Sequence, residues 1–405
     1  MTYPEAVNWL FSRFPSYQLL GATAYKPDLH NVHMLLAALE NPQDSLTCIH
    51  VAGTNGKGST SHILAALCQS HGLKTGIFTS PHLVDFRERI KVNGEKIAEN
   101  KVVAWVNDVI PSLFLGYDAS FFELTFALAL DHFKEQECDV CIIETGLGGR
   151  LDATNIIKPK LCVITNIGYD HQFFLGSTRQ EIASEKAGII KPITPVLIAE
   201  KDESTAGVFK TKANQNNAVL RWVDFNVRIE SDLQGDYQQL NLNTALQAFR
   251  WFCEFEQHVI DNDLVTFALN NVARLTDFHG RMELIQTSPT IIFDVAHNIS
   301  GIKVLLRELK NYNFHTLHLV FGTSNDKDLS DVLAVLPPEA CYYLCEFQNP
   351  RSRKMVEWQQ IGQSNFENFA VFDSPTAGLT KAKLQADEND LILVFGSFFL
   401  IGELF

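Results

Sequence analysis

The stretch Gly53-Thr54-Asn55-Gly56-Lys57-Gly58-Ser59 follows the apolar run Cys48–Ala52 and precedes a helical pattern that extends to about Ser70. A strand, a glycine-rich turn and a helix in this order are typical of a phosphate-binding loop, in which glycines let successive backbone N–H groups face phosphate oxygens. The helix N-terminus adds partial positive charge, and Lys57 adds a full one. An ordinary glycine-rich turn would explain the glycines, but not the lysine between two of them followed by the hydroxyls of Ser59 and Thr60. The stretch therefore predicts nucleotide-phosphate binding.

The loop differs from the general pattern of Gly, four residues, Gly-Lys and Ser or Thr. Val51 stands where the first glycine of that pattern is expected, and Gly58 separates Lys57 from Ser59. In this form the stretch resembles the ATP loop of the Mur ligase superfamily and, within it, that of the folylpolyglutamate synthase and dihydrofolate synthase branch. The resemblance implies that ATP is bound by Thr54, Asn55, Gly56, Lys57, Gly58 and Ser59.

The composition limits the possible classes of protein. A chain of 405 residues exceeds what one hydrophobic core usually supports, so two domains are expected. A net charge of −14 argues against a broad nucleic-acid-binding surface, which needs clustered Lys and Arg. Cys138 and Cys141 form a C-x-x-C pair without a second pair at zinc spacing, and are interpreted as strand residues. The chain shows no secretory signal and no apolar run long enough to cross a bilayer, so we expect a cytoplasmic monomer without membrane contact.

Apolar runs alternate with helical patterns along the chain. Residues 140–143, 161–164 and 195–199 are continuous apolar runs of the kind that is buried on both faces of a parallel sheet. A second alternation begins near Thr290. We therefore predict an α/β fold with a Mur-ligase-like P-loop domain in residues 1–285, built on a mostly parallel sheet, and a smaller Rossmann-like α/β domain in residues 286–405. Ligands of such sheets gather at the carboxyl ends of the strands.

Polar side chains are expected at the carboxyl ends of several of these strands. Glu144 ends an apolar run, and a carboxylate that faces a phosphate loop suits Mg²⁺, which prefers oxygen ligands. Glu144 also opens the run Glu-Thr-Gly-Leu-Gly-Gly-Arg-Leu-Asp-Ala-Thr-Asn, which resembles the same family as the ATP loop. The resemblance implies that Ser80 and Glu144 hold a first magnesium ion and that His171 holds a second.

Lys186 lies in Glu185-Lys186-Ala187-Gly188-Ile189, on what we expect to be the last turn of a helix. A surface lysine would be favoured there by the helix dipole alone. The matching lysine of the superfamily is carbamylated. The resemblance therefore implies that Lys186 carries a carbamate, an oxygen-donor anion that helps to hold the second magnesium ion.

Three later segments extend the resemblance. The stretch 235–241 places Asn241 at an ATP contact, and 279–283 places Arg281 at the phosphates. Asp294-Val295-Ala296-His297-Asn298 resembles the signature that opens the C-terminal domain of the family. The resemblance implies ATP contacts from Asn241, Arg281 and Asp294, and catalytic roles for Lys57, Lys186, Asp294 and His297. His297 is also the candidate base for the incoming amine.

The segment Ser80-Pro81-His82-Leu83, with Phe86-Arg87-Glu88-Arg89-Ile90, resembles the folate branch. About 45 residues precede the first strand, too few for the additional domain of ligases that use nucleotide-linked muramyl substrates. Phenylalanine rings can supply the flat apolar surface that a pteridine needs, although core packing would also explain them. By resemblance, the acceptor site is lined by Ser80, His82, Phe86, Arg87, Phe122, Glu123, Leu151, Asp152 and Ala153.

The resemblance implies an amide ligation that uses ATP and two Mg²⁺ ions, with K⁺ as a further candidate cofactor. A substrate carboxylate takes the γ-phosphoryl group of ATP, and the amine of L-glutamate then displaces phosphate. The acceptor is dihydropteroate, reduced folate or both, so a folylpolyglutamate synthase without the second activity is one alternative. A P-loop kinase that phosphorylates a small molecule and a non-catalytic nucleotide switch are the others.

Overall fold

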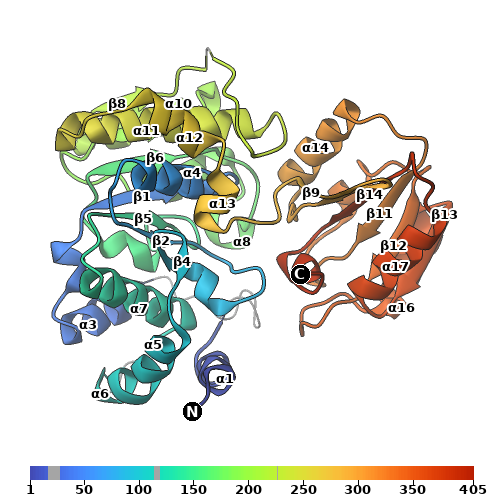
Figure 1. Ribbon diagram of the computed structural model, residues 1–405, viewed down its shortest axis with the longest axis horizontal. Coiled ribbons are helices and arrows are strands. Elements are labelled where there is room, and N and C mark those ends of the chain that lie inside the picture. Colours follow the sequence, from blue (N-terminus) through green and yellow to red (C-terminus); the bar gives the residue numbers. More distant parts are fainter. Residues whose placement is uncertain (17–27, 114–118, 226) are drawn as a thin grey trace. The chain divides into compact units, whose positions relative to one another are not determined.

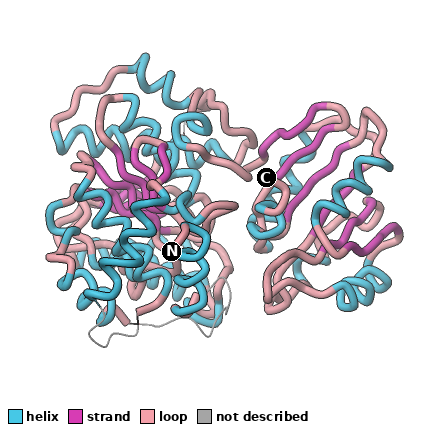
Figure 2. Tube along the Cα trace, turned by 60° about the horizontal axis from the view of Figure 1, so that its bottom comes forward, coloured by secondary structure: helices cyan, strands magenta, loops and turns pink. Residues whose placement is uncertain are grey.

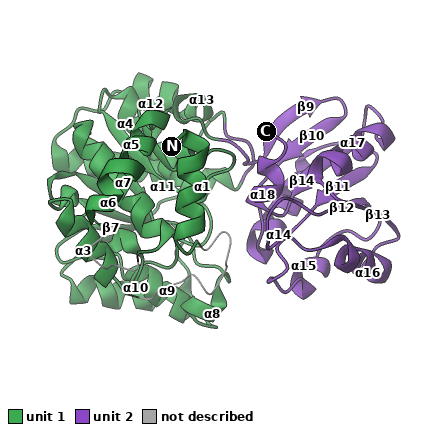
Figure 3. Cartoon of the chain, turned by 90° about the horizontal axis from the view of Figure 1, so that it is seen from below, with its two compact units in different colours: residues 1–232, 237–278 green, residues 233–236, 279–405 purple. Residues whose placement is uncertain are grey.

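The computed structural model describes residues 1–16, 28–113, 119–225 and 227–405 (Figure 1). These residues form two compact units, one of residues 1–232 and 237–278 and the other of residues 233–236 and 279–405 (Figure 3). Each unit contains one sheet, as Figure 2 shows. Within the described ranges, no helix combines the length and the apolar character that crossing a membrane requires.

The sheet of the first unit has eight strands in the order β4-β3-β2-β5-β1-β6-β7-β8. Neighbouring strands pair in parallel through β2, β5, β1, β6, β7 and β8. At the other edge, β3 and β4 add in antiparallel orientation. The central strands β5, β1 and β6 are buried along their whole length, which explains their continuous apolar sequence. The strand bounds are β1 Cys48–Ala52, β2 Thr75–Phe78, β3 Ile90–Val92, β4 Glu95–Lys96, β5 Val140–Glu144, β6 Leu161–Ile164, β7 Val196–Ile198 and β8 Leu220–Trp222.

Helices cover both faces of this sheet. On one face α4 packs against α11, α12 and α13, and on the other α7 shares a core with α1, α3 and α5 (Figure 1). The α-helix bounds are α1 Tyr3–Arg13, α3 His30–Ala38, α4 Lys57–Ser70, α5 Glu99–Ala104, α6 Ile110–Leu113, α7 Phe121–Glu135, α8 Gln172–Leu175, α9 Arg179–Ala187, α10 Glu203–Gln215, α11 Gln238–Glu256, α12 Asn262–Leu269 and α13 Val272–Thr276. A π-helical turn joins α5 to α6, and short 3₁₀ turns are η2 Pro42–Ser45, η3 Phe86–Arg89 and η5 Ala153–Ile156.

The second unit has a six-stranded sheet in the order β13-β12-β11-β14-β10-β9. All its pairs are parallel except the edge pair β10 and β9. The predicted α/β fold with a mostly parallel sheet and a smaller second α/β part is thus confirmed. The bounds are β9 Glu283–Thr287, β10 Thr290–Phe293, α14 Ile299–Glu308, η6 Leu309–Asn311, β11 Leu317–Phe321, α15 Ser330–Leu333, β12 Cys341–Cys345, α16 Met355–Asn365, β13 Asn368–Phe372, α17 Pro375–Gln385, β14 Leu391–Phe395 and α18 Phe398–Gly402.

Candidate active site

The glycine-rich loop lies between β1 and α4, at the carboxyl end of the central strand. Two of its positions admit only glycine. A Cβ atom on Gly53 would lie 1.8 Å from the hydroxyl oxygen of Thr165, at a backbone φ of +153°. Gly56 has a φ of +83°, and a Cβ atom there would lie 2.3 Å from Oδ1 of Asn241. The fold therefore brings Asn241, at the start of α11, against the loop, as its predicted ATP role requires.

The segment after β6 braces the same loop. The backbone N–H of Thr54 donates to the carbonyl of Asn166 at 2.9 Å, and that of Asn55 donates to the Asn166 side chain at 2.8 Å. The Thr54 hydroxyl exchanges hydrogen bonds with the backbone of Gly168, and the Thr165 hydroxyl donates to the Asn55 carbonyl at 2.6 Å. Sequence reasoning missed Asn166, whose role becomes visible only when two parallel strands stand side by side.

Two lysine ammonium groups converge on the carbonyl oxygen of Gly53. Lys57 Nζ donates to it at 3.1 Å and also to the Thr54 carbonyl at 3.2 Å, and Lys186 Nζ donates to it at 2.8 Å. Lys186 comes from the last turn of α9 and is 3% exposed. Burial and, to a smaller extent, the nearby charge of Lys57 lower the pKa of Lys186 to about 7, while Asp170 and Asp152 oppose the shift. A large fraction of this amine is therefore neutral at physiological pH.

The end of β5 brings Glu144 close to Ser80. The backbone N–H of Ser80 donates to Oε2 of Glu144 at 3.4 Å, and Glu144 is 4% exposed. Beside it, the buried hydroxyl of Thr145 has no hydrogen-bond partner among the described residues. A carboxylate, a serine and an unsatisfied hydroxyl at one strand end are a donor set that suits a hard cation such as Mg²⁺.

His171 follows β6 and the loop that braces the glycine-rich segment. Its backbone φ is +50°, a left-handed conformation, and its Nε2 lies 3.8 Å from a carboxylate oxygen of Asp170. Among the described residues, no three His, Cys, Asp or Glu side chains group closely enough to hold a metal ion. The predicted ligand set contains only Glu144 and His171 of these types, so this result does not test it.

Some predicted acceptor residues have structural partners. The Arg87 guanidinium donates three hydrogen bonds to the Asp85 carboxylate. The Glu123 carboxylate accepts from the Ser120 backbone N–H in the capping box that starts α7. Asp152 caps η5 and accepts from the backbone N–H of Leu147 at 2.7 Å. Burial raises the pKa of this carboxyl group, and the hydrogen bonds it accepts oppose the shift. Arg87, Glu123 and Asp152 therefore stabilise the backbone of the segments in which they lie.

The aromatic residues of this region differ in exposure. Phe86 and Phe121 are 2% and 3% exposed and belong to the core that α7 shares with α1. Phe122 is only partly buried, and its ring lies against the backbone of Gly146, two residues after Glu144. Of the predicted phenylalanines, Phe122 therefore presents an accessible ring beside the candidate metal ligand, whereas Phe86 is packed in the core. The neighbouring Leu151 and Ala153 lie on either side of Asp152, in the loop that ends in η5.

In the second unit, Asp294 and His297 lie in the loop after β10, and this loop is hydrogen-bonded to the segment before β9 that contains Arg281. The Asp294 carboxylate accepts from the backbone N–H of Met282 at 2.8 Å and of Ala296 at 2.7 Å. The Arg281 guanidinium carbon lies 5.0 Å from the centre of the Phe398 ring. His297 Nδ1 lies 3.0 Å from the carbonyl oxygen of Val295. Because a carbonyl only accepts, Nδ1 carries the proton and Nε2 is the basic nitrogen of the neutral ring.

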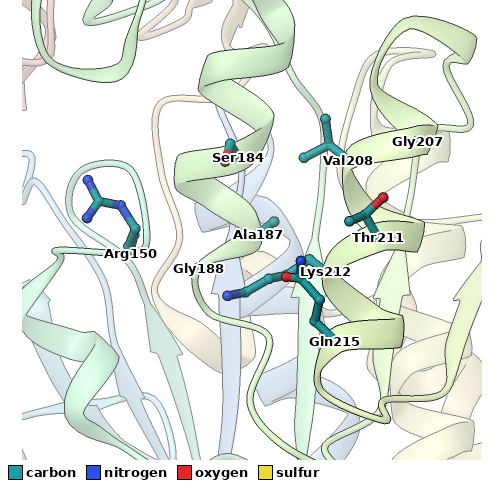
Figure 4. Close-up of a pocket in the computed structure, with 9 residues that line it drawn as sticks. All are labelled: Arg150, Ser184, Ala187, Gly188, Gly207, Val208, Thr211, Lys212 and Gln215. Atoms are coloured by element: carbon teal, nitrogen blue, oxygen red, sulfur yellow. The ribbon is translucent and has the colours of Figure 1, made fainter.

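A separate cleft of about 510 Å³ lies between α9 and α10, on the first unit (Figure 4). Its polar lining includes Ser184, Thr211, Lys212 and Gln215. None of the residues predicted to bind ATP, metal or acceptor lines it, so this cleft is distinct from the predicted site.

Residues 51–273 match the Mur ligase middle domain, and residues 280–398 match the Mur ligase, glutamate ligase domain. The chain belongs to the Mur ligase family. It is 30% identical over 434 residues to the dihydrofolate synthase/folylpolyglutamate synthase of Bacillus subtilis, a match that covers 99% of this chain and 98% of the relative. It is also 30% identical to a "Probable bifunctional folylpolyglutamate synthase/dihydropteroate synthase" of Haloferax volcanii, of whose length it spans 50%.

Solved structures of similar proteins support the same family. Escherichia coli FolC in complex with DHPP and ADP superposes with a TM-score of 0.85 at 27% identity, covering 100% of this chain and 97% of that one. A bifunctional folylpolyglutamate synthase/dihydrofolate synthase with Mn, AMPPNP and L-glutamate bound has a TM-score of 0.85 at 25% identity, covering 98% and 97%. The predicted membership of the folylpolyglutamate synthase and dihydrofolate synthase branch is thus confirmed, and this Mur ligase is an ATP-dependent ligase.

Proposed function

We propose that this Mur ligase adds L-glutamate both to dihydropteroate and to the γ-carboxylate of reduced folates. The observation that carries the proposal is the convergence of Lys57 and the buried Lys186 on the ATP loop, in a chain that matches bifunctional synthases over nearly all its length. The structures of relatives with DHPP, ADP, AMPPNP and L-glutamate bound support the substrate classes. Residues 1–285 would bind ATP and folate, and residues 286–405 would form the glutamate-ligase domain.

The first chemical step is phosphoryl transfer to the acceptor. An acceptor carboxylate oxygen bonds to the γ-phosphorus of ATP as the bond to the ADP oxygen breaks, which leaves an acyl phosphate. Such transfers depend mainly on positioning and charge neutralisation. The backbone N–H groups of the loop, Lys57 and Arg281 would supply these toward the phosphates, with Asn241 beside the loop holding the nucleotide.

Ser80, Glu144, His171 and Lys186 would hold two Mg²⁺ ions, which neutralise charge on the phosphate oxygens when bound. Lys186 can serve as a ligand only after its charge is reversed. Its neutral Nζ would bond to the carbon of CO₂ and release a proton, giving an anionic carbamate. The pKa of about 7 supports this, because the neutral amine that reacts is abundant at physiological pH.

The second step forms the amide. The glutamate nitrogen bonds to the acyl carbon, the carbon–oxygen bond to phosphate breaks, and the nitrogen loses a proton. His297 Nε2 is the candidate acceptor of that proton, because Nδ1 is fixed as a donor to Val295. Asp294 holds the loop that carries His297.

The test is release of ADP with Mg-ATP and L-glutamate, run separately with dihydropteroate and with a reduced folate. We expect glutamate-dependent turnover with both acceptors. Turnover with reduced folate alone would restrict the activity to polyglutamylation. ADP formed without glutamate would indicate a kinase, and absence of turnover with either acceptor would refute the ligase proposal. Replacing Mg²⁺ by other divalent ions and adding K⁺ would test the proposed cofactors, and measuring molar mass by light scattering would test the proposed monomer.

A further inference from the structure

Helix α1 is fastened to the segment that carries the predicted acceptor residues. The Tyr3 hydroxyl donates to Asp85 Oδ1 at 2.5 Å. The Arg87 guanidinium pairs with the same carboxylate, and its carbon lies 5.2 Å from the centre of the Tyr3 ring. Tyr3 and Phe11 lie about two helical turns apart on α1, so the contacts of Tyr3 with Asp85 and Arg87 also fix the position of Phe11.

Phe11 contacts one aromatic residue of α7 and one of the segment that runs from Ser80 to Arg89. Its ring stacks on Phe121, with centroids 4.2 Å apart and planes inclined by 19°, and meets His82 edge-on at 6.1 Å. The rings of Phe86 and Phe121 are buried in the core, whereas Phe11 and His82 are only partly buried. The accessible ring surface of this cluster therefore belongs to Phe11 and His82.

The polar partner of the cluster is Arg89. Its Nε donates to His82 Nδ1 at 2.8 Å, so His82 is neutral and its Nε2 carries a proton that can be donated. Burial lowers the pKa of Arg89 to about 10, and the charges of Glu88 and Glu144 oppose the shift. The cluster thus combines a flat apolar surface with a fixed hydrogen-bond donor.

The position of His82 relates this cluster to the reaction. Ser80, at one end of the segment, lies at Glu144, where the reacting carboxylate of an acceptor must come. Two residues after Ser80, His82 borders Phe11 of α1, and the segment then turns back, since the backbone N–H of Thr79 donates to the carbonyl of Arg89 at 3.1 Å. A pteroate is elongated, with a flat ring system at the end remote from its carboxylate. We expect an acceptor whose carboxylate lies near Glu144 to place its ring end beside His82 and Phe11.

We propose that Phe11 is a specificity-determining residue whose ring packs against the flat, heteroaromatic part of the acceptor, opposite the donor on His82. The proposal rests on the proposed function, because it concerns the same acceptor site. The proposal adds α1 to the acceptor site, for which the sequence predicted no residue of this helix. Stacked aromatic pairs contribute about 0.5–1.5 kcal/mol beyond the area they bury, so loss of the Phe11 ring should weaken acceptor binding by roughly 2- to 10-fold.

The test compares Phe11→Leu, Phe11→Trp and the control Trp9→Leu in steady-state ligation. Trp9 is a partly buried aromatic residue of the same helix that packs against Phe14 instead. We expect Phe11→Leu to raise KM for dihydropteroate by roughly 2- to 10-fold while KM for ATP and for glutamate stay unchanged. Phe11→Trp should keep the wild-type KM, and Trp9→Leu should leave all three values unchanged.

Equal KM values for dihydropteroate in wild type and Phe11→Leu would overturn the proposal, as would a parallel rise in KM for ATP, which would indicate a purely structural role. Circular dichroism and thermal unfolding of each variant identify any that fail to fold, and if Phe11→Leu is among them, Phe11→Met, which also removes the ring, replaces it in the comparison. A wild-type protein that turns over neither acceptor would instead refute the proposed function. The two failures are therefore distinguishable.

Discussion

Replacing Lys186 by methionine should stabilise the protein while abolishing ligation. The lysine is buried beside a second cation, and its pKa is about 7 in the folded chain, whereas a lysine exposed in the unfolded chain has a pKa of 10.5. Below pH 7 the group is charged in both states, so folding bears the full cost of burying the charge. At about 1.4 kcal/mol for each pKa unit, that cost is at most about 5 kcal/mol. Methionine has similar length and no charge, so it removes the cost.

The effect of Lys186 on the free energy of unfolding depends on pH. Between pH 7 and 10.5 the unfolded chain binds more protons at this position than the folded chain, so the wild type gains stability as pH rises. The advantage of Lys186→Met should therefore be greatest at pH 6, fall to about 2 kcal/mol near pH 9, and vanish above 10.5.

The assay is urea unfolding of both proteins at several pH values in buffers free of CO₂, which keep the amine unmodified. The exposed Lys201 gives a control, since Lys201→Met should change stability by less than about 0.5 kcal/mol. A Lys186→Met protein that is no more stable than wild type at pH 6, or an advantage that does not depend on pH, would refute the reasoning. Full ligase activity in the variant would refute the role of Lys186 as a carbamate.

Three further predictions concern other parts of the site. Gly53→Ala should abolish binding of a fluorescent ATP analogue, because its Cβ would lie 1.8 Å from the Thr165 hydroxyl; binding that survives would show that the loop can shift. Asp85→Asn should lower the free energy of unfolding by about 2 kcal/mol at pH 7. Burial raises the pKa of Asp85, but the hydrogen bonds from Arg87 and Tyr3 and the charge of Arg87 outweigh it and hold the pKa at about 2. That difference should be lost as pH falls from 4 to 2, and a difference that persists at pH 2 would contradict the assignment. Glu144→Gln should remove divalent-dependent ADP release, measured by a coupled assay, and wild-type metal dependence in this variant would exclude Glu144 as a ligand.

Much of the fold was predictable because its signals are local. Continuous apolar runs give buried parallel strands, and the run before Gly53 with the lysine and hydroxyls after it gives a phosphate loop in which Lys57 opens α4. The antiparallel edge strands β3, β4 and β9 were not predicted. β3 and β4 have three and two residues, too few to show a periodicity, and β9 is exposed or half-exposed along its length with polar residues among the apolar ones.

The sequence by itself determined the chemical groups of this protein: the ATP loop, the strand-end carboxylate Glu144 and the family to which these motifs belong. Only the tertiary structure decided which groups meet. Lys186 reaches the Gly53 carbonyl across 133 positions of the chain, and Phe11 of α1 stacks on Phe121 of α7. The physical reason is that the pKa of a buried amine and the partner of an aromatic ring depend on what packs around them, and parallel strands bring together loops that are far apart in sequence.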